Sequence, residues 1–185
     1  MLRVTRVVAI AIIPVLTAAF VLLYLFPSRT SQLWAWPVAP TMTAMLMGGG
    51  YLAGAYLFVR VATTRRFHRV GLLFPAITVF TTLLLLATII HWDRFNHDHV
   101  SFWAWLLLYL ITPPLLPWLW IRNRRFETGD PEPGERLVPA PIRTVMVVAG
   151  IGQLAFALVL FVRPSAIAPH WPWMLTPLTA RTLSA

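Results

Sequence analysis

The chain has 185 residues, of which 58% are hydrophobic and only 11% are charged, and its mean hydropathy is +0.73. A soluble domain carries about 25% charged residues, so this composition excludes an ordinary soluble protein and indicates an integral membrane protein. The net charge of +9 is not a nucleic-acid footprint because its arginines flank apolar runs, and the absence of cysteine excludes disulfides, thiolate metal sites and cysteine nucleophiles.

Five apolar runs in the sequence are long enough to cross a bilayer. A membrane core needs about 20 predominantly apolar residues in a helix, because lipid offers backbone groups no other partners. We therefore expect an all-α polytopic transmembrane helix bundle, with the first run retained and not removed as a signal peptide. The five predicted spans are residues 7–26, 41–61, 71–91, 101–121 and 144–162.

The connections between these spans alternate in charge. The N-terminus and the connections after the second and fourth spans carry eleven arginines, whereas the other connections carry only Arg29, Arg94 and Arg163. Arginine-rich connections face the cytoplasm. We therefore expect a multi-pass protein of the cell membrane, a bacterial inner membrane, with its N-terminus in the cytoplasm. The eleven arginines are Arg3, Arg6, Arg60, Arg65, Arg66, Arg69, Arg122, Arg124, Arg125, Arg136 and Arg143.

A phrase of the form P-S-x5-W-x-W-x3-P occurs twice, at residues 27–40 and 164–177. The offset of 137 residues continues upstream, so the sequence predicts a partial parallel internal repeat of residues 6–48 and 143–185. The second copy of the repeat is then shorter than the first, or its last helix is supplied by another chain. Independent use of tryptophan and proline at a membrane surface is the alternative explanation.

The predicted repeat divides the chain into three parts. Residues 1–121 form a four-span unit, and residues 122–142 form a cytoplasmic linker rich in glycine, proline and mixed charges. Residues 143–185 form a partial second repeat with one span and an external segment rich in tryptophan and proline.

The tryptophans of the two phrases are the first candidate site. Tryptophan rings prefer the headgroup level of a membrane, so these loops either anchor the helices or offer an aromatic platform to a lipid, quinone or pigment ring. The candidate cofactor-binding residues are Trp34, Trp36, Trp171 and Trp173.

A loop rich in histidine and aspartate is the second candidate site. His91, Asp93, His97 and His99 lie between the third and fourth spans, and imidazole and carboxylate ligands suit zinc, copper, manganese or non-haem iron. A solvated connector is the alternative, and a proton-handling site is a further one. His91 ends an apolar run, where an ionisable group is often functional.

Two spans contain helix-modifying residues. Gly50 and Gly54 form the small-x3-small pattern that lets helices pack closely, within one subunit or between subunits. Three prolines in the fourth span, Pro113, Pro114 and Pro117, predict a strong kink. The glycine triplet at residues 48–50 allows a break in the second span, and such breaks and kinks are also features of transporter binding sites.

Three segments carry a resemblance. They are FPSRTSQLWAWPVAPTMTAMLMGGGYLAGAY at 26–56, HWDRF at 91–95 and WPWMLTPLTAR at 171–181. They resemble a group of uncharacterised multi-pass bacterial membrane proteins, whose chains continue past the W-x-W-x-x-T-P phrase into more spans. The resemblance implies a membrane helix fold and brings no activity or catalytic residue with it.

The sequence predicts a non-enzymatic integral membrane protein, a subunit of or accessory to a membrane complex. Its partners are then the lipid bilayer and either another membrane protein or further copies of this chain. No residue is predicted to be catalytic, and no acid falls inside a predicted span. The alternatives are a small transporter or a lipid-, quinone- or pigment-binding protein, and a metal or redox protein that uses the His/Asp loop.

Overall fold

The fold is a bundle of long helices, seen in a computed structural model that describes residues 2–126 and 138–185. These residues include five helices long and apolar enough to cross a membrane and no strand, which confirms the predicted all-α bundle of five spans. In chain order, the spans are α1 (Arg3–Phe20) with the π-helical turn η1 (Val21–Leu25), α3 (Thr41–Thr63), α4 (Leu73–Ile90), α5 (Val100–Arg124) and α6 (Ala140–Val162).

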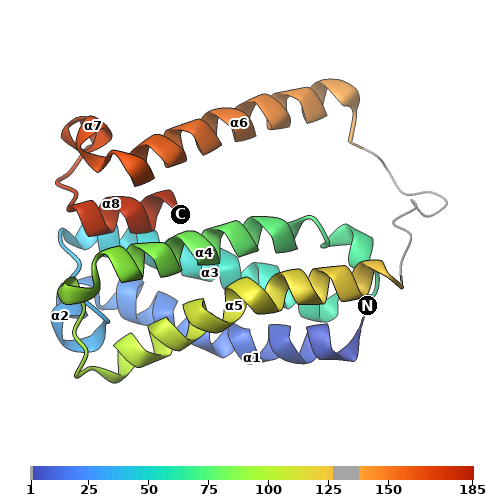
Figure 1. Cartoon of the computed structure of the whole chain (residues 1–185), viewed down its shortest axis with the longest axis horizontal. Helices are drawn as coiled ribbons and strands as arrows, with labels where there is room; N and C mark the ends of the chain where they lie inside the picture. Colours follow the sequence, from blue (N-terminus) through green and yellow to red (C-terminus); the bar gives the residue numbers. More distant parts are fainter. Residues whose placement is uncertain (1, 127–137) are drawn as a thin grey trace.

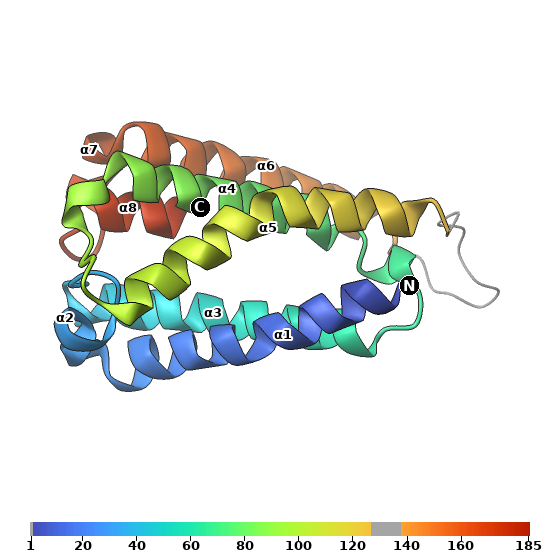
Figure 2. The same cartoon turned by 60° about the horizontal axis from the view of Figure 1, so that its bottom comes forward.

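The first four spans pack together as a compact group. Figures 1 and 2 show α1 running beside α3, and α4 beside α5. Figure 2 also shows that α5 changes direction partway along its length. The three prolines inside α5 explain this bend, because each removes a backbone donor and crowds the preceding turn.

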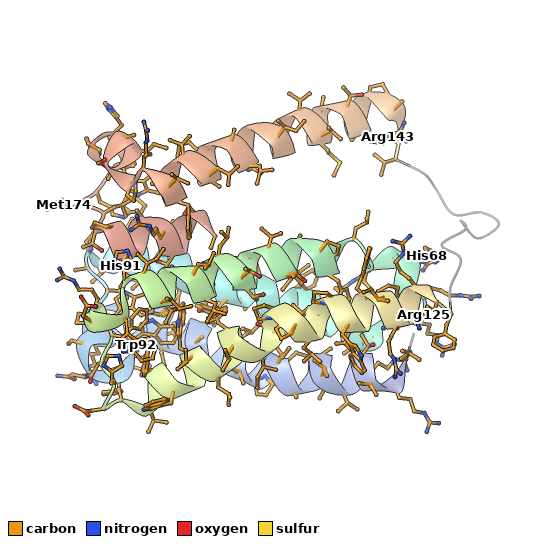
Figure 3. The ribbon with its side chains drawn as sticks, viewed as in Figure 1. His68, His91, Trp92, Arg125, Arg143 and Met174 are labelled. Carbon is orange, nitrogen blue, oxygen red and sulfur yellow. The ribbon has the colours of Figure 1, made fainter. Side chains whose placement is uncertain are left out.

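The connections lie at two opposite ends of the bundle. Figure 3 places His68, Arg125 and Arg143 at one end, here called the arginine end. His91, Trp92 and Met174 lie at the other, here called the tryptophan end. The alternation of charge in the sequence therefore corresponds to two physical ends of one bundle.

A buried amide joins two spans at the arginine end. The Asn123 Nδ2 of α5 donates to Thr5 Oγ1 of α1 at 2.6 Å and to Leu119 O at 2.7 Å. Its Oδ1 accepts a hydrogen bond from the backbone N of Leu2 at 3.0 Å. Because every polar atom of this buried side chain has a partner, Asn123 fastens α1 to α5 at little cost.

The last span stands apart from the other four. Figure 1 shows α6 joined to the bundle at the tryptophan end, where the short helices α7 (Pro164–Ile167) and α8 (Pro177–Ser184) follow it. Helix α8 contacts both α6 and α4. Leu160 is the one buried residue of α6, so nearly all of this helix is free to contact lipid or another chain.

Each tryptophan phrase begins with one short α-helix and one short 3₁₀-helix, in opposite order. In the first, η2 (Pro27–Arg29) and α2 (Thr30–Leu33) precede the tryptophans and α3. In the second, α7 and η5 (Ala168–His170) precede them and α8. The internal duplication and the three-part division stay predictions, and residues 127–137 of the predicted linker lie outside the described residues.

Within one copy of the chain, α3 packs most closely at Gly48, two residues before the predicted glycine pattern begins. A β-carbon at Gly50 would meet no atom within 4 Å, and one at Gly54 would meet only the flexible end of Leu16, at 3.3 Å. A β-carbon at Gly48, by contrast, would lie 3.0 Å from both Cβ and N of Tyr24 in η1. Within one copy of the chain, Gly48 is therefore the position that lets α3 approach the end of α1, and a contact of Gly50 and Gly54 with another subunit stays a prediction.

Candidate functional site: an intramembrane cavity and a second cavity at the tryptophan end

A cavity of about 540 Å³, here called the intramembrane cavity, lies between the packed spans. All four packed spans and α8 contribute to its wall. This volume lies in the range of small-molecule sites in proteins, about 300–1,000 Å³. Residues from each side include Leu16, Gly50, Leu84, Leu108, Thr112 and Leu183.

Most residues in the wall of the intramembrane cavity are apolar, and its few polar groups already have hydrogen-bond partners. The Tyr51 and Tyr109 hydroxyls, from α3 and α5, share a hydrogen bond of 2.9 Å. Thr81 donates to Thr78 O within α4, and Thr112 donates to Leu108 O within α5. Such a surface suits hydrocarbon and offers no charge to an ion.

An aromatic cluster lies beside this cavity towards the tryptophan end. Trp105 of α5 is its centre, with ring centroids 5.8 Å from Trp34, 4.9 Å from Trp36 and 6.3 Å from Phe95. The two tryptophan contacts are edge-to-face, an arrangement favoured by the ring quadrupole. Trp105 Nε1 also donates to Thr88 Oγ1 of α4 at 2.9 Å, so the cluster ties together α4, α5 and the first tryptophan phrase.

Burial changes the interpretation of the first tryptophan pair. Trp34 and Trp36 are only 6% and 2% exposed, because neighbouring rings cover their faces. The Nε1 atoms of both are buried without a hydrogen-bond partner among the described residues. These two residues therefore form part of the protein interior and not an open aromatic platform.

The second tryptophan pair lies closer to the surface and attaches the C-terminal segment. Trp173 Nε1 donates to Thr43 Oγ1 at the start of α3, at 2.8 Å. The Trp171 ring lies over Phe156 of α6, with centroids 6.4 Å apart. Among the described residues, no ring contact joins this pair to Trp34 or Trp36.

A second cavity, of about 480 Å³, lies at the tryptophan end. It brings together the first tryptophan phrase, the loop after α4 and the start of α8. Its wall contains both a carboxylate and a guanidinium, unlike that of the intramembrane cavity. Residues that line it include Trp36, His91, Asp93, Arg94, Thr176 and Leu178.

One contact beside the second cavity holds α8 in place. Arg181 Nη1 of α8 lies 2.7 Å from His91 Nε2, and Arg181 Nε donates to Phe161 O of α6 at 3.0 Å. Arginine only donates hydrogen bonds, so His91 Nε2 accepts and the ring is neutral. Arg181 therefore links the ends of α4 and α6 through α8.

The surroundings of His91 favour this neutral form. The pKa of His91 is lowered from its usual 6.5 first by burial and then by the charges of Arg181 and Arg94, while Asp93 acts in the opposite direction. Because the folded-state pKa is depressed, the contact stabilises the docked α8 above about pH 6.5. This contribution is lost as the pH falls through the lowered pKa of His91.

Acidification should therefore loosen α8. We expect amide hydrogen exchange in α8, corrected for the intrinsic pH dependence of exchange, to accelerate as the pH is lowered from 7.5 through the pKa of His91. In a His91→Gln variant the side-chain oxygen still accepts from Arg181 and does not titrate, so the corrected rate should be constant with pH. Equal pH dependence in both proteins would contradict the role of His91.

The predicted metal ligands have other neighbours. His91 contacts Arg181, the His97 ring lies 4.9 Å from Trp92 and 4.7 Å from Phe102, and His99 Nδ1 lies 3.2 Å from Ser101 Oγ. Within the described residues, no three His, Cys, Asp or Glu side chains come together as a group that could hold a metal ion. The structure therefore does not assemble His91, Asp93, His97 and His99 into the predicted site.

Sequence reasoning named Gly50, Trp36, His91 and Asp93, which line the two cavities, but it missed the paired tyrosines and the contact of Arg181. Tyr51 and Tyr109 carried a usable signal, because a hydroxyl inside an apolar span needs a partner. Arg181 carried another, as a charge within an apolar stretch. Their partners are 58 and 90 residues away in the chain, so no local pattern names them. Comparisons of the chain with protein-family models, curated proteins and solved structures find no match.

Proposed function

We propose that this integral membrane protein binds a hydrocarbon chain of a lipid-like molecule in the intramembrane cavity. The observation that carries the proposal is the cavity itself: about 540 Å³, lined by all four packed spans, with its hydroxyl groups already bonded. Binding without chemistry is favoured because no acid lies inside a described span to drive catalysis or ion coupling.

We propose further that the arginine end faces the cytoplasm. The excess of arginine at that end supports this orientation through the positive-inside rule. The tryptophan end and the second cavity then lie at the outer surface of the cell membrane. A relationship to multi-pass bacterial membrane proteins is consistent with this location.

Filling the intramembrane cavity should abolish binding. Gly50 lines the cavity, and a β-carbon there would meet no atom within 4 Å, so the backbone can accept the larger side chain of Gly50→Leu at the cavity wall. We expect diacylglycerol, used as an uncharged two-chain probe, to bind the purified wild-type protein and to bind this variant at least tenfold more weakly. The affinity of each protein is measured by native mass spectrometry, with diacylglycerol titrated into the purified protein in detergent.

The adjacent glycine provides a matched control. Gly49 is also free of neighbours within 4 Å and does not line the cavity. Gly49→Leu makes the same chemical change on the same helix and should bind diacylglycerol as the wild type does. If Gly50→Leu binds as well as Gly49→Leu, the cavity is not the site and the proposed function is wrong.

A second proposal, that the protein works as an oligomer, is favoured by one residue of α6. Gln153 lies near the middle of this span, is exposed, and makes no hydrogen bond to any described residue. An amide facing lipid is costly, and glutamine often bonds across helix interfaces. Because an amide both donates and accepts, Gln153 of a second copy satisfies it in a two-fold contact.

Disulfide formation tests this contact directly, since the chain contains no cysteine. We expect Gln153→Cys to form a cross-linked dimer on mild oxidation in membranes. Ile151→Cys lies at nearly the same depth but on the opposite side of α6, because each residue turns a helix by about 100°. It should cross-link at least fivefold less, and equal cross-linking would exclude the proposed contact.

A further inference from the structure

We infer that the second cavity binds the headgroup of a zwitterionic phospholipid that carries a primary ammonium, as phosphatidylethanolamine does. The inference rests on the proposed function, because the acyl chain of the same molecule occupies the intramembrane cavity. It assigns a ligand class to a site whose wall is charged.

Two opposite charges in the second cavity are available to a ligand. Asp93 and Arg94 are consecutive residues of η4 (Trp92–Arg94), and both line the cavity and are exposed. Neither side chain forms a hydrogen bond or an ion pair with another described residue. A ligand with one phosphate and one ammonium matches this pair, because Arg94 recognises phosphate and Asp93 accepts from an ammonium.

Charge complementarity also disfavours other lipids. An anionic headgroup without an ammonium leaves Asp93 unpaired and is repelled by it. Arg181 does not line the second cavity, and its Nη1 and Nε atoms are bonded to His91 Nε2 and Phe161 O. Arg94 is therefore the guanidinium of the cavity wall that remains available for a phosphate.

Helix α8 connects the two cavities. Leu178 lines the second cavity, whereas Thr182 and Leu183 line the intramembrane cavity. These positions are one helical turn apart, about 6 Å along the axis. Leu84 of α4 and His91, directly after the end of α4, line the same two cavities, about 10 Å apart by the same rise.

This spacing matches the order of parts in a phospholipid, with a charged headgroup above apolar chains. His91, which lines the headgroup cavity, lies at the tryptophan end (Figure 3), where a bilayer surface is expected. The apolar cavity is lined by residues within four of the spans. One molecule placed along α8 therefore meets a charged wall and an apolar wall in the correct sequence.

Lipid titrations of the purified protein in detergent, measured by native mass spectrometry, test the inference. The probes are phosphatidylethanolamine, phosphatidylglycerol and diacylglycerol with identical acyl chains. We expect phosphatidylethanolamine to bind the wild type about tenfold more tightly than the other two lipids. Asp93→Asn should remove its preference over phosphatidylglycerol, and Arg94→Gln should reduce its affinity to that of diacylglycerol.

Two substitutions at the same end serve as controls. Asp98→Asn and Arg163→Gln make the same charge changes outside the second cavity and should retain the wild-type preference. The headgroup assignment is overturned if Asp93→Asn and Arg94→Gln also retain it. In that case diacylglycerol binding that Gly50→Leu abolishes still supports the proposed function. If Gly50→Leu binds every probe as the wild type does, the proposed function itself fails.

Discussion

Trp105→Ala should be the most destabilising single substitution in the membrane-spanning part of the chain. The change removes the ring that contacts Trp34, Trp36 and Phe95, and it also removes the donor to Thr88. Truncation of a buried tryptophan to alanine costs about 3–5 kcal/mol, from lost burial and from the cavity left behind. Unfolding in mixed micelles, followed by circular dichroism as denaturing detergent increases, measures the loss.

Trp103 provides the control for this experiment. It lies on the same helix, half a turn away, but it is 55% exposed. Its ring contacts Phe102 and its Nε1 donates to His97 O, so Trp103→Ala removes a donor as well as a ring. We expect a loss of less than about 1 kcal/mol, typical of an exposed position. Similar losses for the two variants would show that the aromatic cluster does not organise the bundle.

Gly48→Ala should cause the second largest loss of stability, although it adds only one methyl group. In Gly48→Ala, the new methyl group meets Cβ and N of Tyr24 at 3.0 Å and Cβ of Leu23 at 3.3 Å. These atoms are backbone or attached directly to it, so they cannot move aside as the end of a flexible side chain would. Overpacking of this kind costs about 1–3 kcal/mol and should separate η1 from α3. The same unfolding experiment measures it.

Gly50→Ala tests whether the effect is specific to position 48. The methyl group at position 50 meets no atom within 4 Å, and alanine is a better helix former than glycine. This variant should be as stable as the wild type or up to about 1 kcal/mol more stable. Loss of stability in both variants, by the same amount, would show that the close contact at position 48 is not the cause of the loss.

The number and position of the spans could be predicted from the sequence because they depend on local properties. About 20 consecutive apolar residues can only be stable in lipid as a helix, whatever the rest of the chain does. The predicted fifth span begins four residues later than α6, which starts at Ala140. Arginine and proline near the ends of helices obscure such boundaries, since helices extend beyond the apolar core into the interface.

The neighbours of each side chain could not be predicted in this way. The small-residue pattern in α3 is present on two adjacent faces, and only the position of η1 selects Gly48 over Gly50. The tryptophans of both phrases look equally suited to a membrane surface, yet the aromatic rings around Trp34 and Trp36 bury the first pair.

The sequence by itself determined the class of this protein, its five spans and the two ends of different charge. Hydropathy and charge are properties of individual residues and short segments, so the spans and the charged ends can be predicted from the sequence. The tertiary structure decided where the cavities lie, which tryptophans are buried and which residue holds His91. These features depend on contacts such as that between His91 and Arg181, 90 positions apart, whose free energy arises only when packing brings both side chains together.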